Sequence, residues 1–147
     1  MKVLFYIMLV AIGIQDMRTY FISRWWILVL LPVGIGMLTV YPVPVWESVT
    51  GACLYGLPGL FMHLWHRDWI GSADVAFFFY YGSLLGCYRM MVAMFFSLFI
   101  AFIWLFIKKK RKQSMIPFLT CMSIGVGVSL FKGYAIWYTT ILPFFSP

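Results

Sequence analysis

Residues 90–112, MMVAMFFSLFIAFIWLFIKKKRK, contain the two signals that decide the fold: a long apolar run and the basic run that ends it. An apolar run of about 17 residues or more with few charges is typical of a helix that crosses a membrane. A block of lysines and arginines directly beside such a run is typical of a cytoplasmic loop. This stretch therefore predicts a membrane-spanning helix that ends on the cytoplasmic side.

Further apolar segments lie on both sides of this stretch. We expect six membrane-spanning helices, over residues 3–15, 25–41, 48–65, 70–87, 90–107 and 115–131. Because 64% of the 147 residues are hydrophobic and only 10% are charged, little of the chain is left for a soluble domain. The predicted fold is an all-α polytopic membrane bundle that forms one domain over residues 1–147. The final segment, residues 133–147, is interpreted as too short for another crossing.

The basic residues predict the orientation of these helices. With the N-terminus outside, eight of the eleven Lys and Arg residues lie in cytoplasmic loops, namely Arg18, Arg24, Arg67 and the run 108–112. The three that then lie outside are Lys2, Arg89 and Lys132. The opposite orientation reverses this ratio. The net charge of +7 does not indicate nucleic-acid binding, because no basic face exists outside the 108–112 run.

The chain has four acidic residues, and this topology brings two of them to the same membrane face. Asp16 ends the first predicted helix on the cytoplasmic side, and Asp74 begins the fourth just inside that side. An ionisable side chain within a span is costly, by about 2.5 kcal/mol at the bilayer centre, and usually faces the bundle interior. The other two acids, Glu47 and Asp68, fall in predicted loops, where a solvated position is expected.

Two carboxyl groups that meet at one site share a proton, because ionising both would place two negative charges at short range, which is energetically costly. The protonated carboxyl then donates to a carbonyl oxygen while the ionised one activates a water, which is the chemistry of aspartic peptide hydrolysis. Asp16 and Asp74 are therefore the candidate catalytic residues. Two structural alternatives remain open: an interfacial ion pair of Asp16 with Arg18 or Arg24, and an N-cap role for Asp74.

Neither a metal site nor a cofactor is expected. The two histidines that precede Asp68 lack a convincing further ligand. Cys53, Cys87 and Cys121 form no CxxC pair and are interpreted as buried small hydrophobic residues. The aromatic residues, 21% of the chain, are expected mostly to face lipid.

Three blocks of the sequence resemble, in order, motifs of the type IV prepilin peptidases, which are membrane aspartyl peptidases of the GxGD class. IQDMRTYFIS at residues 14–23 resembles their IDLRTRRIPN-like motif, and its catalytic aspartate falls on Asp16. IGSADVAFFF at residues 70–79 resembles GxGD and the apolar helix after it, with Asp74 as the second catalytic aspartate. MIPFLTCMSIG at residues 115–125 resembles an IPFGPFL-like segment of a late span.

The resemblance implies an endopeptidase that cleaves the basic leader from type IV prepilins or type II secretion pseudopilins, at the cytoplasmic face of the bacterial inner membrane. Gly71, Ser72 and Ala73 would let an extended substrate backbone approach the aspartates. The expected partners are this substrate and the lipid bilayer. The paired CxxC motifs of bifunctional members are absent, so methyltransferase activity is not expected.

Departures from the motifs leave other functions open. Ala73 stands where GxGD has its second glycine, and Ser23 and Arg24 replace a common Pro-Asn pair. These changes are compatible with a catalytically inactive relative that assists pilus or secretion assembly. A small proton-coupled transporter that uses Asp16 and Asp74 as a relay is disfavoured, because both acids lie at one face. A cleaved N-terminal signal peptide is disfavoured because no small-x-small cleavage site follows.

Overall fold

The computed structural model describes residues 2–19, 22–23, 25–66, 70–108 and 117–145, which are mostly helical and contain no strand. The helices are α1 (Lys2–Thr19), α2 (Trp25–Val40), α3 (Val45–Trp65), α4 (Ser72–Lys108), α5 (Phe118–Ile136), the π-helical turn η1 (Trp137–Ile141) and α6 (Leu142–Phe145). The all-α prediction is confirmed.

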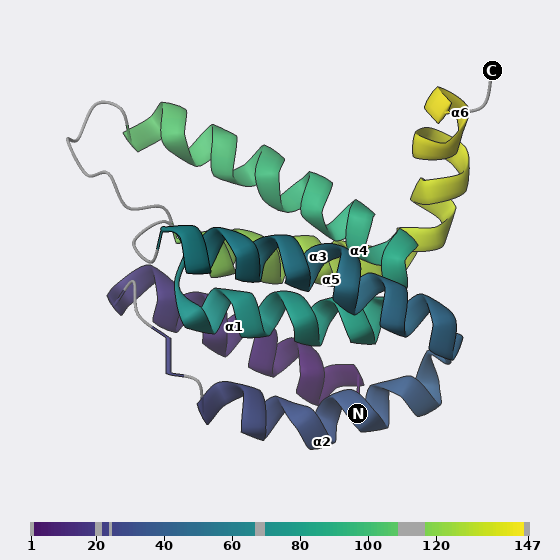
Figure 1. The fold of residues 1–147 in the computed structure, drawn as a ribbon, viewed down its shortest axis with the longest axis horizontal. Coiled ribbons are helices and arrows are strands. Elements are labelled where there is room, and N and C mark those ends of the chain that lie inside the picture. Colours follow the sequence, from purple (N-terminus) through teal and green to yellow (C-terminus); the bar gives the residue numbers. More distant parts are fainter. Residues whose placement is uncertain (1, 20–21, 24, 67–69, 109–116, 146–147) are drawn as a thin grey trace.

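α4 consists of two helical arms joined at a sharp break. Gly86 has φ 74° and ψ 175°, which are not helical angles. Glycine adopts this conformation readily, whereas a side chain makes it costly. In Figure 1 the chain reverses at the break, so that the second arm, residues 87–108, runs in the opposite direction to the first. The predicted helices 70–87 and 90–107 correspond to these two arms.

The helices alternate in direction between two ends of the bundle (Figure 1). One end carries the end of α1, the end of α3, the end of the second arm of α4, and the beginnings of α2, α4 and α5. We call it the Asp end, because Asp16 and Asp74 lie near it. The opposite end carries the N-terminus, the turn between α2 and α3, and the break in α4. Each of the six predicted segments coincides with one helix or one arm.

By length and composition, two helical stretches of the described chain are long and apolar enough to cross a membrane: Ser72–Ile107, which contains the break at Gly86, and Phe118–Thr140. Trp25–Val40 is a shorter apolar helix. The second stretch extends past the predicted 115–131 helix and contains a kink at Lys132, where φ is −137° and ψ is 18°. After this kink the chain continues through η1 into α6, and in Figure 1 this C-terminal segment turns away from the line of α5.

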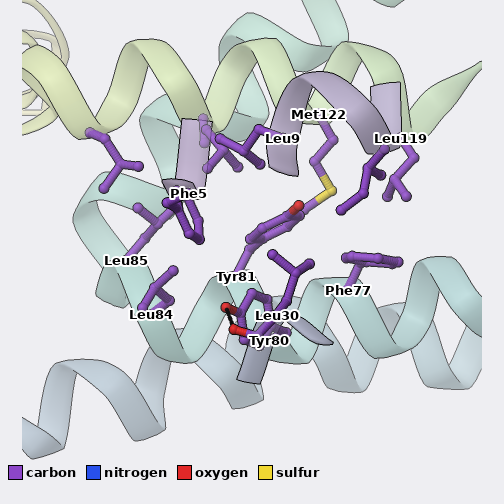
Figure 2. Close-up of a cluster of buried hydrophobic side chains, with 14 of the residues drawn as sticks. Phe5, Leu9, Leu30, Phe77, Tyr80, Tyr81, Leu84, Leu85, Leu119 and Met122 are labelled. Atoms are coloured by element: carbon purple, nitrogen blue, oxygen red, sulfur yellow. Dashed lines mark hydrogen bonds between the residues drawn. The ribbon is translucent and has the colours of Figure 1, made fainter. Parts of the chain in front are cut away.

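Aromatic side chains fill the centre of the bundle. Figure 2 shows Tyr81 of α4 among side chains of neighbouring helices, including Leu9 of α1 and Met122 of α5, and Tyr81 is fully buried. The adjacent Tyr80 donates its hydroxyl to the carbonyl oxygen of Leu30 at 2.7 Å and so ties α4 to α2. These buried rings of α4 are exceptions to the expectation that most aromatic residues face lipid, whereas rings such as Trp25, Phe61 and Phe102 are exposed. Large rings at helical spacing bury more apolar area than aliphatic side chains and pack between helices.

Close contact between α3 and α4 depends on glycines. Gly51, Gly56 and Gly59 of α3 are all buried. A Cβ at Gly51 would collide with the backbone of Gly82, and one at Gly56 would collide with the ring of Phe79. The two helices are therefore packed at a distance that larger residues at these positions would not allow.

Glu47 is buried at the end of the bundle opposite the Asp end, so the prediction of a solvated position is wrong. The turn after α2 is short, and Glu47 already falls in the first turn of α3. Its Oε2 accepts a hydrogen bond from the Tyr134 hydroxyl at 3.1 Å. The Arg89 guanidinium lies over the same Tyr134 ring, 4.1 Å from the ring centroid. This polar cluster joins α3, α5 and the second arm of α4.

Candidate active site

Asp16 continues the buried stripe of α1. Phe5, Leu9 and Ile12 face the core at helical spacing, and Asp16 takes the next position on the same face. Its exposed fraction is only 7%. A carboxylate buried to this extent needs hydrogen bonds to replace those it made with water.

Thr120, in the first turn of α5, supplies these hydrogen bonds. Its backbone N–H donates to Asp16 Oδ2 at 2.8 Å, and its Oγ1 lies 3.0 Å from the same oxygen. α5 begins after Pro117, which provides no side-chain cap. Asp16 thus caps the start of α5 from 104 residues away. The free N–H groups and the dipole of a helix favour an anion at this point.

Among the described residues, the contacts of Asp16 do not include an ion pair with Arg18. The side chain of Arg18 is exposed on the last turn of α1. The described hydrogen bonds of Asp16 go to Thr120. Arg24, the other arginine considered, lies outside the described residues, so that half of the alternative stays open.

Asp74 is half-buried in the first turn of α4. Its Oδ2 accepts the backbone N–H of Gly71 at 3.3 Å. In this contact a residue in the first turn satisfies the N–H of the residue just before the helix. Asp74 is therefore not the N-cap residue that the sequence left open, because α4 already begins at Ser72; it caps the helix start through this long reciprocal hydrogen bond to Gly71 instead.

The structure brings the two predicted acids together at the Asp end. Asp16 comes from the end of α1 and Asp74 from the beginning of α4. The two carboxyl groups are close enough to interact electrostatically. Their catalytic roles stay a prediction, but their proximity is a property of the fold.

Gly71, Ser72 and Ala73 form the entry to α4 beside Asp74. Gly71 is exposed, and Ser72 and Ala73 are half-buried. Within α4 the one departure from helical backbone angles is at Gly86, so Ala73 has ordinary helical angles. Alanine adopts these angles without strain. The missing second glycine of the motif therefore creates no conformational problem in this backbone.

His63 fixes the segment that leads into α4. Its Nδ1 lies 2.7 Å from the carbonyl oxygen of Ile70. Because a carbonyl oxygen only accepts, Nδ1 carries the proton in this hydrogen bond. The contact ties the last turns of α3 to the residue before Gly71. From the sequence, the one role considered for this histidine was that of a metal ligand. No pattern in the sequence predicts its hydrogen bond to Ile70.

An apolar groove of about 310 Å³ runs between α1 and α5 beside Asp16. Its lining includes Gly13 and Met17 of α1 and Thr120 and Gly127 of α5. A Cβ at Gly13 would come no closer than 3.7 Å to its neighbours, and one at Gly127 no closer than 3.8 Å. Neither glycine position is therefore filled by neighbouring atoms. Thr120 lines the groove and also contacts Asp16.

In the described part of the chain, no group of three or more His, Cys, Asp or Glu side chains is placed to hold a metal ion. Asp68 lies outside the described residues. Cys121 is buried and Cys87 half-buried, but Cys53 is exposed. The prediction of a buried position is therefore wrong for Cys53, because its side chain lies on a face of α3 that points away from the core.

The family model described as the type IV leader peptidase family matches residues 3–106. The match covers more than half of the chain and includes both Asp16 and Asp74. No curated protein and no solved structure matches the chain significantly.

Proposed function

The chain belongs to the type IV leader peptidase family, and from this membership we propose that it is a membrane aspartyl endopeptidase that removes the basic leader of type IV prepilins or type II secretion pseudopilins. The proposed catalytic pair is Asp16 and Asp74. The observation that carries the proposal is that the family match includes both acids, which interact at one end of the bundle. The proposed setting is the bacterial inner membrane, crossed six times, with the Asp end at the cytoplasmic face.

Exposed apolar side chains support a membrane setting. Large hydrophobic residues point outward on α1, α2, α3 and the second arm of α4, for example Val10, Ile35, Leu64 and Phe102. A soluble monomer rarely exposes apolar surface of this extent. Two stretches also have the length and composition of membrane spans.

In the proposed reaction the ionised carboxylate takes a proton from a water whose oxygen attacks the scissile carbonyl carbon. The protonated carboxyl donates its proton to the carbonyl oxygen. As the resulting diol collapses, the C–N bond breaks, and the leaving nitrogen takes the proton that the first carboxylate had accepted. A hydroxyl of the diol returns a proton to the second carboxyl. The pair ends with one proton, as it began.

The surroundings of the pair fit a substrate with an apolar segment beside the cut bond. The groove is lined mainly by apolar side chains and extends from Met17 near the Asp end to Tyr6, about three helical turns along α1. Gly71 is exposed next to Asp74 and leaves room for an extended backbone. A basic leader would lie at the cytoplasmic surface, where the two acids attract cations.

Co-expression with a prepilin, followed by gel electrophoresis of the substrate, tests the proposal. We expect the wild type to shorten the prepilin, and Asp16→Asn or Asp74→Asn to reduce cleavage by a factor of about 10² or more. Asn at position 16 keeps an oxygen that accepts the N–H of Thr120, so this variant separates chemistry from the capping of α5. Asp68→Asn is the matched control, because the proposal gives this acid no role.

Two outcomes contradict the proposal. A wild-type protein that leaves the prepilin uncut is not a leader peptidase for that substrate class. If an Asn variant cuts at the wild-type rate, the aspartate that it replaces is not a member of the catalytic pair. The amount of each variant in the membrane is measured in parallel, so that loss of protein is not read as loss of activity.

The capping contacts favour a second candidate, a family member that does not cut. Asp16 caps α5 and Asp74 accepts the N–H of Gly71. These two structural roles account for both acids without catalysis. Such a protein would assist pilus or secretion assembly as a membrane component, and both Asn variants would then alter stability with no cleavage activity to lose.

A further inference from the structure

The hydroxyl of Thr120 lies between two groups that ordinarily accept hydrogen bonds. Its Oγ1 is 2.9 Å from the carbonyl oxygen of Gly13 and 3.0 Å from Asp16 Oδ2. A hydroxyl has one proton to donate and two lone pairs that accept. When Asp16 is ionised, the hydroxyl therefore donates to only one of these two oxygens at a time.

In both protonation states of Asp16, each proton shared between its carboxyl group and the Thr120 hydroxyl has an acceptor. With an ionised carboxylate, the hydroxyl donates to Oδ2 alongside the backbone N–H of Thr120, which lies at 2.8 Å. With a protonated carboxyl, Oδ2 donates to Oγ1, and the hydroxyl proton turns to the carbonyl oxygen of Gly13. Only protons move between the two arrangements.

We propose that Thr120 is a positioning residue that holds Asp16 in one place while that carboxyl gains and loses a proton. The inference rests on the proposed function, in which each member of the catalytic pair changes protonation during every turnover. Thr120 acts through Asp16 and has no contact with the reacting atoms in this role. The hydroxyl is suited to it because it is both donor and acceptor, whereas the backbone N–H only donates.

Two described titratable groups interact with Asp16 electrostatically, namely Asp74 on α4 and the thiol of Cys121 on α5. Arg18 on α1 is exposed. Among the described residues, Thr120 supplies the hydrogen bonds to Asp16 Oδ2, through its N–H and its hydroxyl.

Thr120→Val tests the inference, because valine has nearly the same shape and leaves the backbone N–H in place but lacks the hydroxyl. With full-length protein and a prepilin substrate, we expect kcat to fall about tenfold to hundredfold, as for the loss of a hydrogen bond to a charged group. KM should stay unchanged, since the hydroxyl has no proposed contact with substrate. Thr120→Ser keeps the hydroxyl and should restore kcat close to the wild-type value.

Thr50→Val is the matched control. The Thr50 hydroxyl donates to the carbonyl oxygen of Trp46 within α3, far from the Asp end, so its loss should leave kcat unchanged. A wild-type kcat in Thr120→Val, with a wild-type protein that cuts, overturns the inference. A reduced kcat in both Thr120→Val and Thr120→Ser also overturns it, because the hydroxyl would then not be the group that matters.

Infrared spectroscopy of the acidified, detergent-solubilised full chain gives a readout that does not depend on activity. The carbonyl stretch of protonated Asp16 is identified as the band that Asp16→Asn removes. We expect this band at higher frequency in Thr120→Val than in the wild type, because the carboxyl loses its acceptor. An equal frequency in the two proteins overturns the inference. If the wild type leaves the prepilin uncut, the proposed function fails while this measurement still decides the role of the hydroxyl.

Discussion

Ala73 is the residue at which the chain departs from the GxGD pattern, and its backbone has the helical angles that alanine adopts without strain. Because position 73 has helical angles, a glycine there has no conformational advantage. We predict that Ala73→Gly leaves the rate of prepilin cleavage unchanged. The free energy of unfolding should fall by about 0.5–1 kcal/mol, since glycine is a poorer helix former than alanine. Cleavage assays and denaturant unfolding of the purified variant check the two parts.

A several-fold gain in cleavage by Ala73→Gly would contradict this argument. It would mean that substrate binding requires a closer backbone approach, or a different backbone conformation, than the helix allows with alanine. Ala76→Gly is the control, because it makes the same change on α4 one turn deeper, at a position with no proposed role in the site.

The two aspartates were predictable from sequence, but their hydrogen-bond partners were not. Asp16 and Asp74 are rare charges beside apolar runs, and the alternation in helix direction brings them to one end of the bundle. Thr120 lies in the third motif-like block, yet nothing in its spacing shows that its N–H meets a carboxylate 104 residues earlier. That contact depends on how α1 packs against α5, which a hydropathy pattern does not encode.

Gly86, at the break in α4, is the described glycine with a positive φ, a conformation that a side chain makes costly. Gly86 has φ 74°, and a Cβ there would lie 3.0 Å from Val43 Cγ1 and 3.2 Å from Glu47 Cβ. We predict that Gly86→Ala lowers the free energy of unfolding by about 1–3 kcal/mol, the cost of holding a side chain in this conformation. Thermal and denaturant unfolding in detergent measure the change.

Gly127→Ala is the matched control for the break. Gly127 lies within α5, and a Cβ there has open space, with Tyr6 at 3.8 Å as its nearest contact. Alanine at this position should therefore raise the free energy of unfolding by about 0.5–1 kcal/mol through helix propensity alone. Equal effects of the two substitutions would show that the break does not need a glycine.

The helices themselves were easier to predict than the turns between them. Each apolar run became a helix or an arm, because continuous apolar segments of this length favour helices whatever their neighbours. The sequence separated the two arms of α4 but did not show that they join at a single residue. The sequence did not predict the burial of Glu47 either, because that burial depends on the break at Gly86 and on the short turn before α3. Together they bring the Glu47 carboxylate within hydrogen-bond distance of the Tyr134 hydroxyl.

The proposed orientation of the whole molecule in the membrane depends on a small surplus of positive charge, and most of that surplus comes from one run. The proposed topology puts eight basic residues inside and three outside, and five of the eight lie at 108–112. Replacing these five with glutamine leaves three on each side, so the bias that orients the bundle disappears. We predict that the wild-type chain adopts one orientation and that the five-fold variant divides between two.

Reporter fusions after residue 112 and within the α2–α3 turn measure this directly. In the wild type, a phosphatase active only outside the cytoplasm should be inactive after residue 112 and active in the turn, because the end of the second arm of α4, which precedes the basic run, and the α2–α3 turn lie at opposite ends of the bundle (Figure 1). The five-fold variant should show activity at both points and should lose prepilin cleavage in proportion. An exported reporter after residue 112 in the wild type would place Asp16 and Asp74 on the outer face. The basic leader of a prepilin stays in the cytoplasm, so aspartates on the outer face could not reach the cleavage site. That single result would therefore also exclude prepilins as the substrate.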